Sequence, residues 1–296
     1  MNSEELKRRI ANLNMWKKGA QRAPHKPLLI LYALGKCLRG EKRLISYKDV
    51  DRDLRKLLHE FGPPRKSLHP EHPFCRLQND GIWELVGAEH LQDQKRVSDI
   101  SRRKLLDSNV YGGFTKEIYR ILTSEHQLVA ELVTQILEAN FPSTYHEDLL
   151  QAVGIDIEDK ATRVKPRDPY FRDKVLLAYE YQCAICGFNV RIGDSLVALE
   201  AAHIKWHQAG GPDQESNGIA LCSLHHKLFD RGAFTLTDEM IMKVSELAHG
   251  TTGFQEWLMA FHGLKIRTPQ RPIYYPESSF VQWHLKEVFK GYSRYG

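Results

Sequence analysis

The sequence predicts an α+β protein built from two domains. Its 296 residues exceed the usual size of one domain, which is about 100–200 residues. Apolar residues recur at helical spacing through much of the first half, with short strand-like pieces between them. In the second half, paired cysteine and histidine residues at matched spacing indicate a small unit organised around a metal ion. We therefore assign domains to residues 1–154 and 171–296, the second with a C-terminal extension.

A linker is expected between these domains, over residues 155–170. This stretch is charged, poor in apolar residues and contains two prolines, a composition that is typical of linkers. The spacing of apolar residues predicts helices on both sides of the linker. The expected helices are 3–11, 27–38, 49–60, 115–139, 171–181 and 278–290.

A β-hairpin is expected in the first domain. A strand-like piece around Pro73 to Leu77 precedes the turn sequence Asn79-Asp80-Gly81, and the apolar piece 82–85 follows that turn. Two such pieces around an Asp-Gly turn are a hairpin signal.

Charge is concentrated at the start of the chain. The formal net charge is +5, whereas residues 1–50 alone contain 12 basic and 4 acidic side chains, a local charge of +8. Such a patch suits a polyanionic partner such as nucleic acid, although a solvated helical face would have the same composition. We find neither an apolar run of about 20 residues nor the apolar core of a signal peptide, so we expect a soluble, cytoplasmic protein.

Five cysteines, an odd number, argue against a closed set of disulfides. Cys183-x-x-Cys186 has the spacing in which a tight turn brings two thiolates to one ion, and Cys222-x-x-His225 repeats that spacing. Together the two pairs supply the four ligands of a closed, tetrahedral structural zinc site.

Three more residues accompany the two pairs in an informative order: His203, Asn217 and His226. With their flanking sequences EAAHI, NG and LCSLHHKLFDRG, they resemble the HNH endonuclease motif. The resemblance implies a ββα-metal fold, in which two strands carry His203 and Asn217 and a helix carries His226. The zinc would join the loops that hold this element in shape.

The resemblance also implies the catalytic roles. His203 would be the general base that deprotonates a water molecule, a task that suits an imidazole. His226 would bind a catalytic divalent ion, Mg²⁺, Mn²⁺ or another, and Asn217 would fix the loop, orient His203 or help to position the ion. The spacing favours His225 for zinc and His226 for catalysis, and the reverse assignment stays open. Ala202 stands where many HNH nucleases have a second metal ligand, and Glu200 could replace it.

Three stretches of the first half carry a second resemblance: RAPHKPLL from residue 22, HPFCRLQ from residue 72 and NVYGGF from residue 109. They resemble the sulfur-binding domain of phosphorothioate-dependent, McrA-type restriction endonucleases. Sulfur is larger and more weakly hydrated than oxygen, so such a site should combine cations with apolar atoms. The residues that the resemblance implies for DNA contact are Arg22, His25, Lys26, His72, Pro73, Arg76, Arg102 and Arg103.

Together these observations predict a modification-dependent DNA endonuclease. Its recognition domain would bind phosphorothioate-modified double-stranded DNA, and its HNH domain would hydrolyse nearby phosphodiester bonds. A homodimer is compatible with cutting of both strands. Two alternatives remain: an HNH endonuclease that reads another mark, such as methylcytosine, and a non-catalytic, zinc-stabilised DNA-binding regulator.

Overall fold

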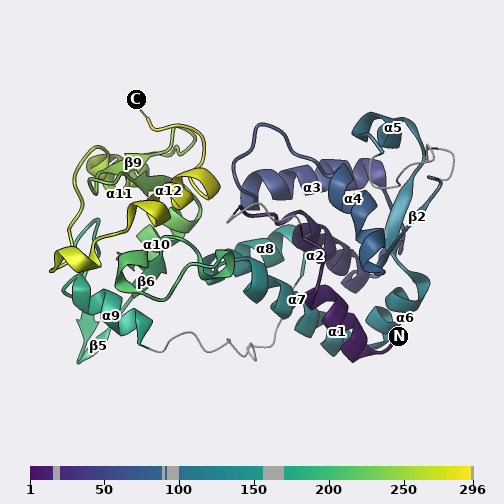
Figure 1. Ribbon diagram of the computed structural model, residues 1–296, viewed down its shortest axis with the longest axis horizontal. Helices are drawn as coiled ribbons and strands as arrows, with labels where there is room; N and C mark the ends of the chain where they lie inside the picture. Colours follow the sequence, from purple (N-terminus) through teal and green to yellow (C-terminus); the bar gives the residue numbers. More distant parts are fainter. Residues whose placement is uncertain (16–20, 89–90, 92–99, 156–169, 295–296) are drawn as a thin grey trace. The chain divides into compact units, whose positions relative to one another are not determined.

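The computed structural model describes residues 1–15, 21–88, 91, 100–155 and 170–294 (Figure 1). The chain divides into two compact units, Met1–Arg163 and Val164–Gly296. Most of the predicted linker over residues 155–170 lies outside the described residues, so the linker and the exact domain limits stay predictions. Ile155, at the start of the predicted linker, is buried with 4% exposure.

The first unit is built around a helix that is apolar on nearly all sides. Helix α2 (His25–Leu38) buries every side chain from Lys26 to Leu34 and contacts α3, α4, α6, α7 and α8 (Figure 1). A helix that is hydrophobic all round belongs in a core. The other helices of this unit are α1 (Ser3–Ala11), α3 (Tyr47–Phe61), α4 (Glu71–Arg76), α5 (Arg102–Asp107), α6 (Lys116–Ser124), α7 (His126–Asn140) and α8 (His146–Val153).

A small antiparallel sheet completes the first unit. Its strands are β1 (Ile45–Ser46), β2 (Trp83–Val86) and β3 (Tyr111–Phe114), in the order β1-β3-β2. A Cβ atom at Gly113 would lie 2.1 Å from the carbonyl oxygen of Arg43, so the close approach of these segments requires glycine.

Two expectations for the first unit are wrong. Residues 73–77 do not form a hairpin strand: α4 and a 3₁₀ turn over Leu77–Asp80 occupy this stretch, and β2 pairs with β3 instead. A segment of five mostly apolar residues is too short for its periodicity to tell a strand from a short helix. The helix expected over 115–139 is two helices, because Glu125 leaves the helical region at φ −126° and ψ 79°. The other helices expected in this unit are confirmed to within a few residues.

The second unit contains the expected ββα element. Strand β6 (Leu199–His203) pairs antiparallel with β7 (Gly218–Cys222), and α10 (Ser223–Asp230) follows β7 directly. Around it lie α9 (Phe171–Ala178), β4 (Arg191–Ile192), β5 (Ser195–Leu196), β8 (Phe234–Leu236), β9 (Met242–Val244), α11 (Thr252–Trp257) and α12 (Ser278–Glu287).

The core of the second unit holds the two strands against α9 and α10. Val175 of α9, Ile219 of β7 and Phe229 of α10 are completely buried there. A Cβ atom at Gly218 would lie 2.3 Å from the Cγ2 atom of Val175, so this position keeps α9 close to the strand that precedes α10. Among the described residues, no helix is long and apolar enough to cross a membrane.

Candidate functional site

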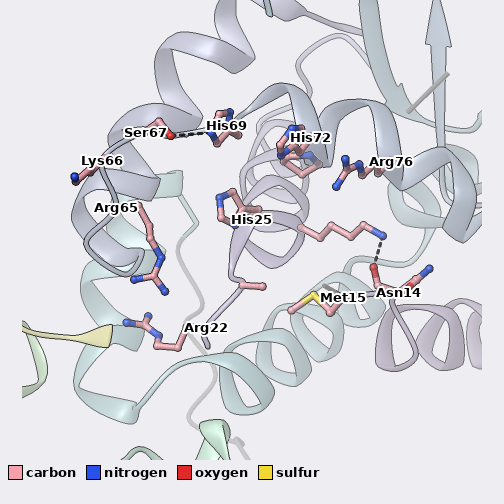
Figure 2. A pocket seen from close by; sticks show the side chains of 13 residues that line it. Asn14, Met15, Arg22, His25, Arg65, Lys66, Ser67, His69, His72 and Arg76 are labelled. Carbon is pink, nitrogen blue, oxygen red and sulfur yellow. Dashed lines mark hydrogen bonds between the residues drawn. The ribbon is translucent and has the colours of Figure 1, made fainter. Parts of the chain in front are cut away.

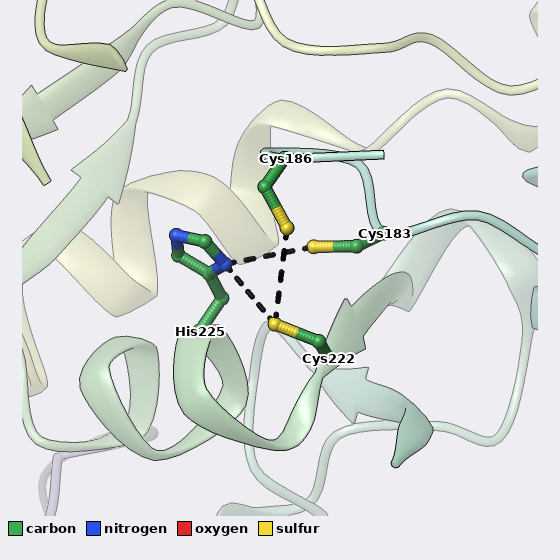
Figure 3. Close-up of side chains that lie close together, drawn as sticks. All are labelled: Cys183, Cys186, Cys222 and His225. Carbon is green, nitrogen blue, oxygen red and sulfur yellow. Dashed lines mark hydrogen bonds between the residues drawn. The ribbon is translucent and has the colours of Figure 1, made fainter. Parts of the chain in front are cut away.

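The four predicted zinc ligands converge on one point of the second unit (Figure 3). Cys183 and Cys186 lie in a tight turn, in which the N–H of Gly187 donates to the carbonyl of Cys183 at 2.9 Å. Cys222 ends β7 and His225 lies in the first turn of α10. Their ligand atoms all lie within 4.8 Å of one another.

The distances within this cluster fit a tetrahedral zinc ion. The Sγ atoms of Cys186 and Cys222 are 3.9 Å apart, and the Nδ1 atom of His225 is 3.2 Å from Cys222 and 3.7 Å from Cys183. Zinc–sulfur bonds of ~2.3 Å at the tetrahedral angle would place sulfur atoms ~3.8 Å apart. The Nε2 atom of His225 bonds to the carbonyl of Trp257 at 2.8 Å, which turns Nδ1 toward the sulfurs. The spacing assigned His225 to this cluster, and its position agrees.

His203 is held by contacts on one edge and one face of its ring. It ends β6, opposite Gly218, and is 9% exposed. Its Nε2 atom lies 2.7 Å from the Oδ1 atom of Asp213, and Phe171 stacks on the ring with centroids 4.0 Å apart. The carboxylate of Asp213 can stabilise a positive imidazole ring, and both contacts limit its rotation.

Asn217 closes the loop that connects the two strands. Its Oδ1 atom accepts from the backbone N–H of Lys205 at 2.8 Å, and its Nδ2 atom donates to the carbonyls of Lys205 and Pro212. The side chain is completely buried. Of the three roles expected for Asn217, these contacts support fixing the loop.

His226 lies between two carboxylates. Its Nδ1 atom is 2.6 Å from the Oε2 atom of Glu200, and its Nε2 atom is 3.2 Å from the Oδ2 atom of Asp230. Burial by itself would lower the pKa of His226, but the charges and hydrogen bonds of Asp230 and Glu200 raise it to about 9. The hydrogen bond from His226 in turn holds the pKa of Glu200 below its usual range. An imidazole nitrogen and a carboxylate therefore lie together at this position.

A cavity of about 580 Å³ lies in the first unit, and six of the eight predicted DNA-contacting residues line it (Figure 2). These residues are Arg22, His25, Lys26, His72, Pro73 and Arg76. They come from the segment before α2, from the start of α2 and from α4. No aspartate or glutamate is among the described residues that line the cavity. Its lining is therefore basic, with apolar atoms from Met15, Ala23 and Pro73.

His25 and Lys26 differ in charge state at this cavity. Burial lowers the pKa of His25 to about 4, helped by the nearby His72, His69 and Arg65, so its ring is neutral at pH 7. The Nζ atom of Lys26 donates to the carboxylate of Asp80 at 2.5 Å and to the carbonyl of Asn14 at 2.7 Å. The charge of Lys26 is thus already balanced, which the sequence reasoning did not anticipate.

Arg102 and Arg103 do not line this cavity. Arg102 binds the buried Asp51 with two hydrogen bonds of 2.7 Å, while Arg103 is 93% exposed and 3.7 Å from Asp107. Their contacts with DNA stay a prediction that the cavity does not support.

Sequence reasoning missed several residues of these sites. Asp213 follows the loop sequence AGGP and carries no motif of its own. The cavity lining also includes Asn14, Met15, Ala23, Arg65, Lys66, Ser67 and His69. A usable signal was the basic run around Arg65, which lies between two proline-containing segments.

The comparisons with known proteins agree with both resemblances. The family model of the ScoMcrA-like DNA sulfur-binding domain matches residues 3–158, and that of an HNH endonuclease matches residues 183–237. No curated protein matches the sequence.

Several solved structures are similar to about half of this chain. The sulfur binding domain of SprMcrA complexed with phosphorothioated DNA is 23% identical, with a TM-score of 0.45, covering 52% of this chain and 95% of that one. The corresponding ScoMcrA domain is 20% identical, with a TM-score of 0.44, covering 50% of this chain and 94% of that one. The type IV phosphorothioation-dependent restriction endonuclease ScoMcrA is also 20% identical, with a TM-score of 0.43, and the match covers 50% of this chain but 28% of that one.

The match to the sulfur-binding family, from residue 3 to residue 158, spans more than half of the chain. The second match covers the ββα element that carries His203 and His226. The chain therefore belongs to the ScoMcrA-like DNA sulfur-binding domain family, and its HNH domain makes it a DNA endonuclease.

Proposed function

We propose that this protein recognises phosphorothioate-modified DNA through the cavity of its first unit and hydrolyses nearby phosphodiester bonds with its HNH domain. The observation that carries the proposal is the convergence on one basic cavity of His25 with Pro73 and Arg76, which follow it by about fifty residues in the sequence. All three belong to the stretches that resemble sulfur-binding domains. The solved sulfur-binding domains of ScoMcrA and SprMcrA are described as complexed with phosphorothioated DNA.

The chemistry of the cavity supports selection of sulfur over oxygen. Arg22 and Arg76 offer positive charge for the anion, while Met15 and Pro73 offer apolar atoms. An oxygen that enters an apolar pocket loses a hydrogen bond to water, which costs ~1–3 kcal/mol, whereas the weakly hydrated sulfur loses little. That difference corresponds to roughly 5- to 150-fold in affinity.

In the HNH domain, we assign the role of general base to His203. We assign to Asp213 the role of orienting the ring of His203. The carboxylate beside Nε2 orients the ring and stabilises the imidazolium that forms when His203 takes up a proton. Phe171 restricts the ring on one face. Asn217 keeps the intervening loop closed, so we infer that its contribution to catalysis is indirect.

The catalytic divalent ion is assigned to Glu200 and His226. Glu200 is partly exposed and contacts the Nδ1 atom of His226. Asp230 is almost completely buried and contacts the Nε2 atom of the same ring. A metal-ligating histidine usually donates its other ring N–H to a carboxylate. Asp230 is the carboxylate in that position beside His226. The carboxylate of Glu200 and water molecules suit Mg²⁺ or Mn²⁺, and the imidazole of His226 also suits Ni²⁺. When bound, such an ion masks phosphate charge and stabilises the leaving oxygen.

The direct test uses duplexes that differ by one sulfur atom. Binding and metal-dependent cleavage are measured on phosphorothioate, methylcytosine and unmodified versions of the same duplex. We expect tighter binding and cleavage only for the sulfur-bearing duplex. Equal binding to all three removes the sulfur assignment, cleavage of the methylated duplex supports the methylcytosine alternative, and binding without cleavage in Mg²⁺ or Mn²⁺ supports the regulator.

Two further assignments complete the proposal. Cleavage of both strands requires two active centres or two events, so we assign a homodimer on DNA, which sedimentation with and without the modified duplex tests. We assign the cytoplasm as its location, because the HNH endonuclease domain acts on DNA.

A further inference from the structure

His69, Glu71 and His72 form a second cluster of metal-ligating side chains, far in sequence from the cysteine cluster. One ligand atom from each of the three residues lies within 4.8 Å of the other two. The Nδ1 atom of His69 is 2.8 Å from the Oε1 atom of Glu71. The rings of His69 and His72 stack with their centroids 4.8 Å apart. Two imidazoles and a carboxylate are a common ligand set for zinc and related transition-metal ions.

An independent observation comes from Glu71, whose carboxylate is only half satisfied. The residue is 9% exposed, and its Oε2 atom is buried without a hydrogen-bond partner. A buried carboxylate oxygen that lacks a donor is costly, and a bound cation would remove that cost. Glu71 also supplies the negative charge that a cation needs beside the basic residues of this cavity.

The second ring nitrogen of His69 is already fixed. Its Nε2 atom lies 2.8 Å from the hydroxyl oxygen of Ser67 (Figure 2). Its Nδ1 atom therefore faces Glu71. Metal-binding histidines usually have such a partner on the nitrogen that does not bind the ion.

The cluster is closed on one side and open on the other. His69 and His72 line the 580 Å³ cavity, whereas Glu71 is buried and is not part of its lining. An ion held by these three residues would have protein behind it and the cavity in front of it. Sites with three protein ligands keep positions for water or another ligand, as catalytic zinc sites do.

From these observations we infer that His69, Glu71 and His72 bind a divalent transition-metal ion, such as Zn²⁺, in the wall of the recognition cavity. Bonds of ~2.1 Å separate the ligand atoms of a tetrahedral ion by ~3.4 Å, so the His69–Glu71 contact of 2.8 Å must widen slightly when an ion enters between them. The lone pairs of imidazole lie in the ring plane, and the two rings are within 15° of parallel. Binding therefore turns one ring, that of His72, out of the stack.

Cobalt provides the test, because its spectrum distinguishes this site from the cysteine cluster. The full-length protein and its variants are brought to equilibrium with buffered Co²⁺ by dialysis, and metal content and absorption are measured. His69→Ala, His72→Ala and Glu71→Gln should each hold one cobalt ion fewer than the wild type. The matched control is His126→Ala, which removes an exposed histidine of the same unit and should keep the wild-type content.

The absorption that the wild type has and the three variants lack should consist of visible d–d bands without thiolate-to-cobalt charge transfer. Added inorganic thiophosphate should shift these bands, because the open positions face the cavity. Unchanged metal content in the three variants, with circular dichroism showing that they are folded, would overturn the inference. If the bands do not respond to thiophosphate, the inference that the ion has open coordination positions facing the cavity is wrong. None of these readouts depends on DNA, so they succeed or fail separately from the proposed function.

Discussion

The Nε2 atom of His203 lies 2.7 Å from the Oδ1 atom of Asp213, ten residues later in the chain. The same loop is fastened at its far end by Asn217, whose buried amide bonds to the backbone of Lys205 and Pro212. The proposed base is thus oriented by a loop that folds back on the strand that carries it. In this modification-dependent endonuclease, loop geometry and proton transfer are expected to be coupled.

Asp213→Asn should lower the cleavage rate without lowering the affinity for DNA. The amide keeps the shape of the side chain but removes the charge that stabilises the imidazolium, so we expect a ~10- to 100-fold decrease in kcat with little change in KM. His203→Ala should cost more, about 100- to 10,000-fold. Single-turnover cleavage measures both. A wild-type rate and pH profile in Asp213→Asn would contradict the orienting role.

Asn217→Ala should destabilise the second unit. The substitution leaves one partly buried N–H and two carbonyls without the amide that they bond to. Each lost hydrogen bond costs ~1 kcal/mol or more, so the free energy of unfolding should fall by about 2–4 kcal/mol. Urea denaturation measures the change. A loss of cleavage with unchanged stability would instead indicate direct participation in catalysis.

Glu200→Gln should raise the concentration of Mg²⁺ or Mn²⁺ that cleavage requires. Loss of one carboxylate ligand should weaken metal binding by roughly 10- to 100-fold, which a titration of cleavage rate against metal concentration detects. Glu239→Gln is the matched control, because that side chain is fully exposed. If both variants respond alike to the metal, Glu200 is not a ligand.

Cys183→Ser should remove the proposed structural ion and unfold the second unit. Structural zinc sites contribute ~10–16 kcal/mol in small peptides, as much as the whole stability of a typical domain. The expected results are loss of one zinc ion by elemental analysis and loss of cleavage. Cys37→Ser replaces a buried cysteine outside the cluster, and this variant should keep the zinc ion of the cluster. Retention of zinc in Cys183→Ser would argue against the cluster.

The stability of the first unit should fall as the pH drops from about 6.5 to 4. Burial holds the pKa of His25 at about 4, below its ordinary value of 6.5, so the unfolded chain binds the proton first in this window. The contribution of the neutral His25 ring to the free energy of unfolding is fully present above pH 6.5. It amounts to about 1–3 kcal/mol. His25→Gln, which cannot titrate, should show a flatter dependence in urea melts at pH 4.5 and 7.

The sequence predicted those parts of the fold whose signal is local. The apolar spacing of α1, α2 and α3 repeats within a few residues of the chain, and these helices form close to where they were expected. The failed hairpin shows the limit, because the partner of β2 is chosen by packing some thirty residues away. The break at Glu125 has neither glycine nor proline to mark it.

The candidate sites divide in the same way. The spacing of Cys183, Cys186, Cys222 and His225 was sufficient for the cluster, because each pair lies on a single turn. Neither the balancing of Lys26 by Asp80 nor the bond between His203 and Asp213 follows from spacing, since both join residues through loops. The six cavity residues were found through a family resemblance rather than through a physical pattern in the sequence.

Strands β6 and β7 connect the cysteine cluster to the proposed base. Cys222 pairs with Leu199 at one end of this two-stranded ribbon, and His203 pairs with Gly218 at the other, four residues or about 13 Å away. Peroxides and other oxidants that convert these thiolates to sulfenic acids or disulfides would loosen the ribbon at one end and misalign an imidazole that they never touch. We therefore expect DNA cutting by this protein to depend on the reducing power of its surroundings.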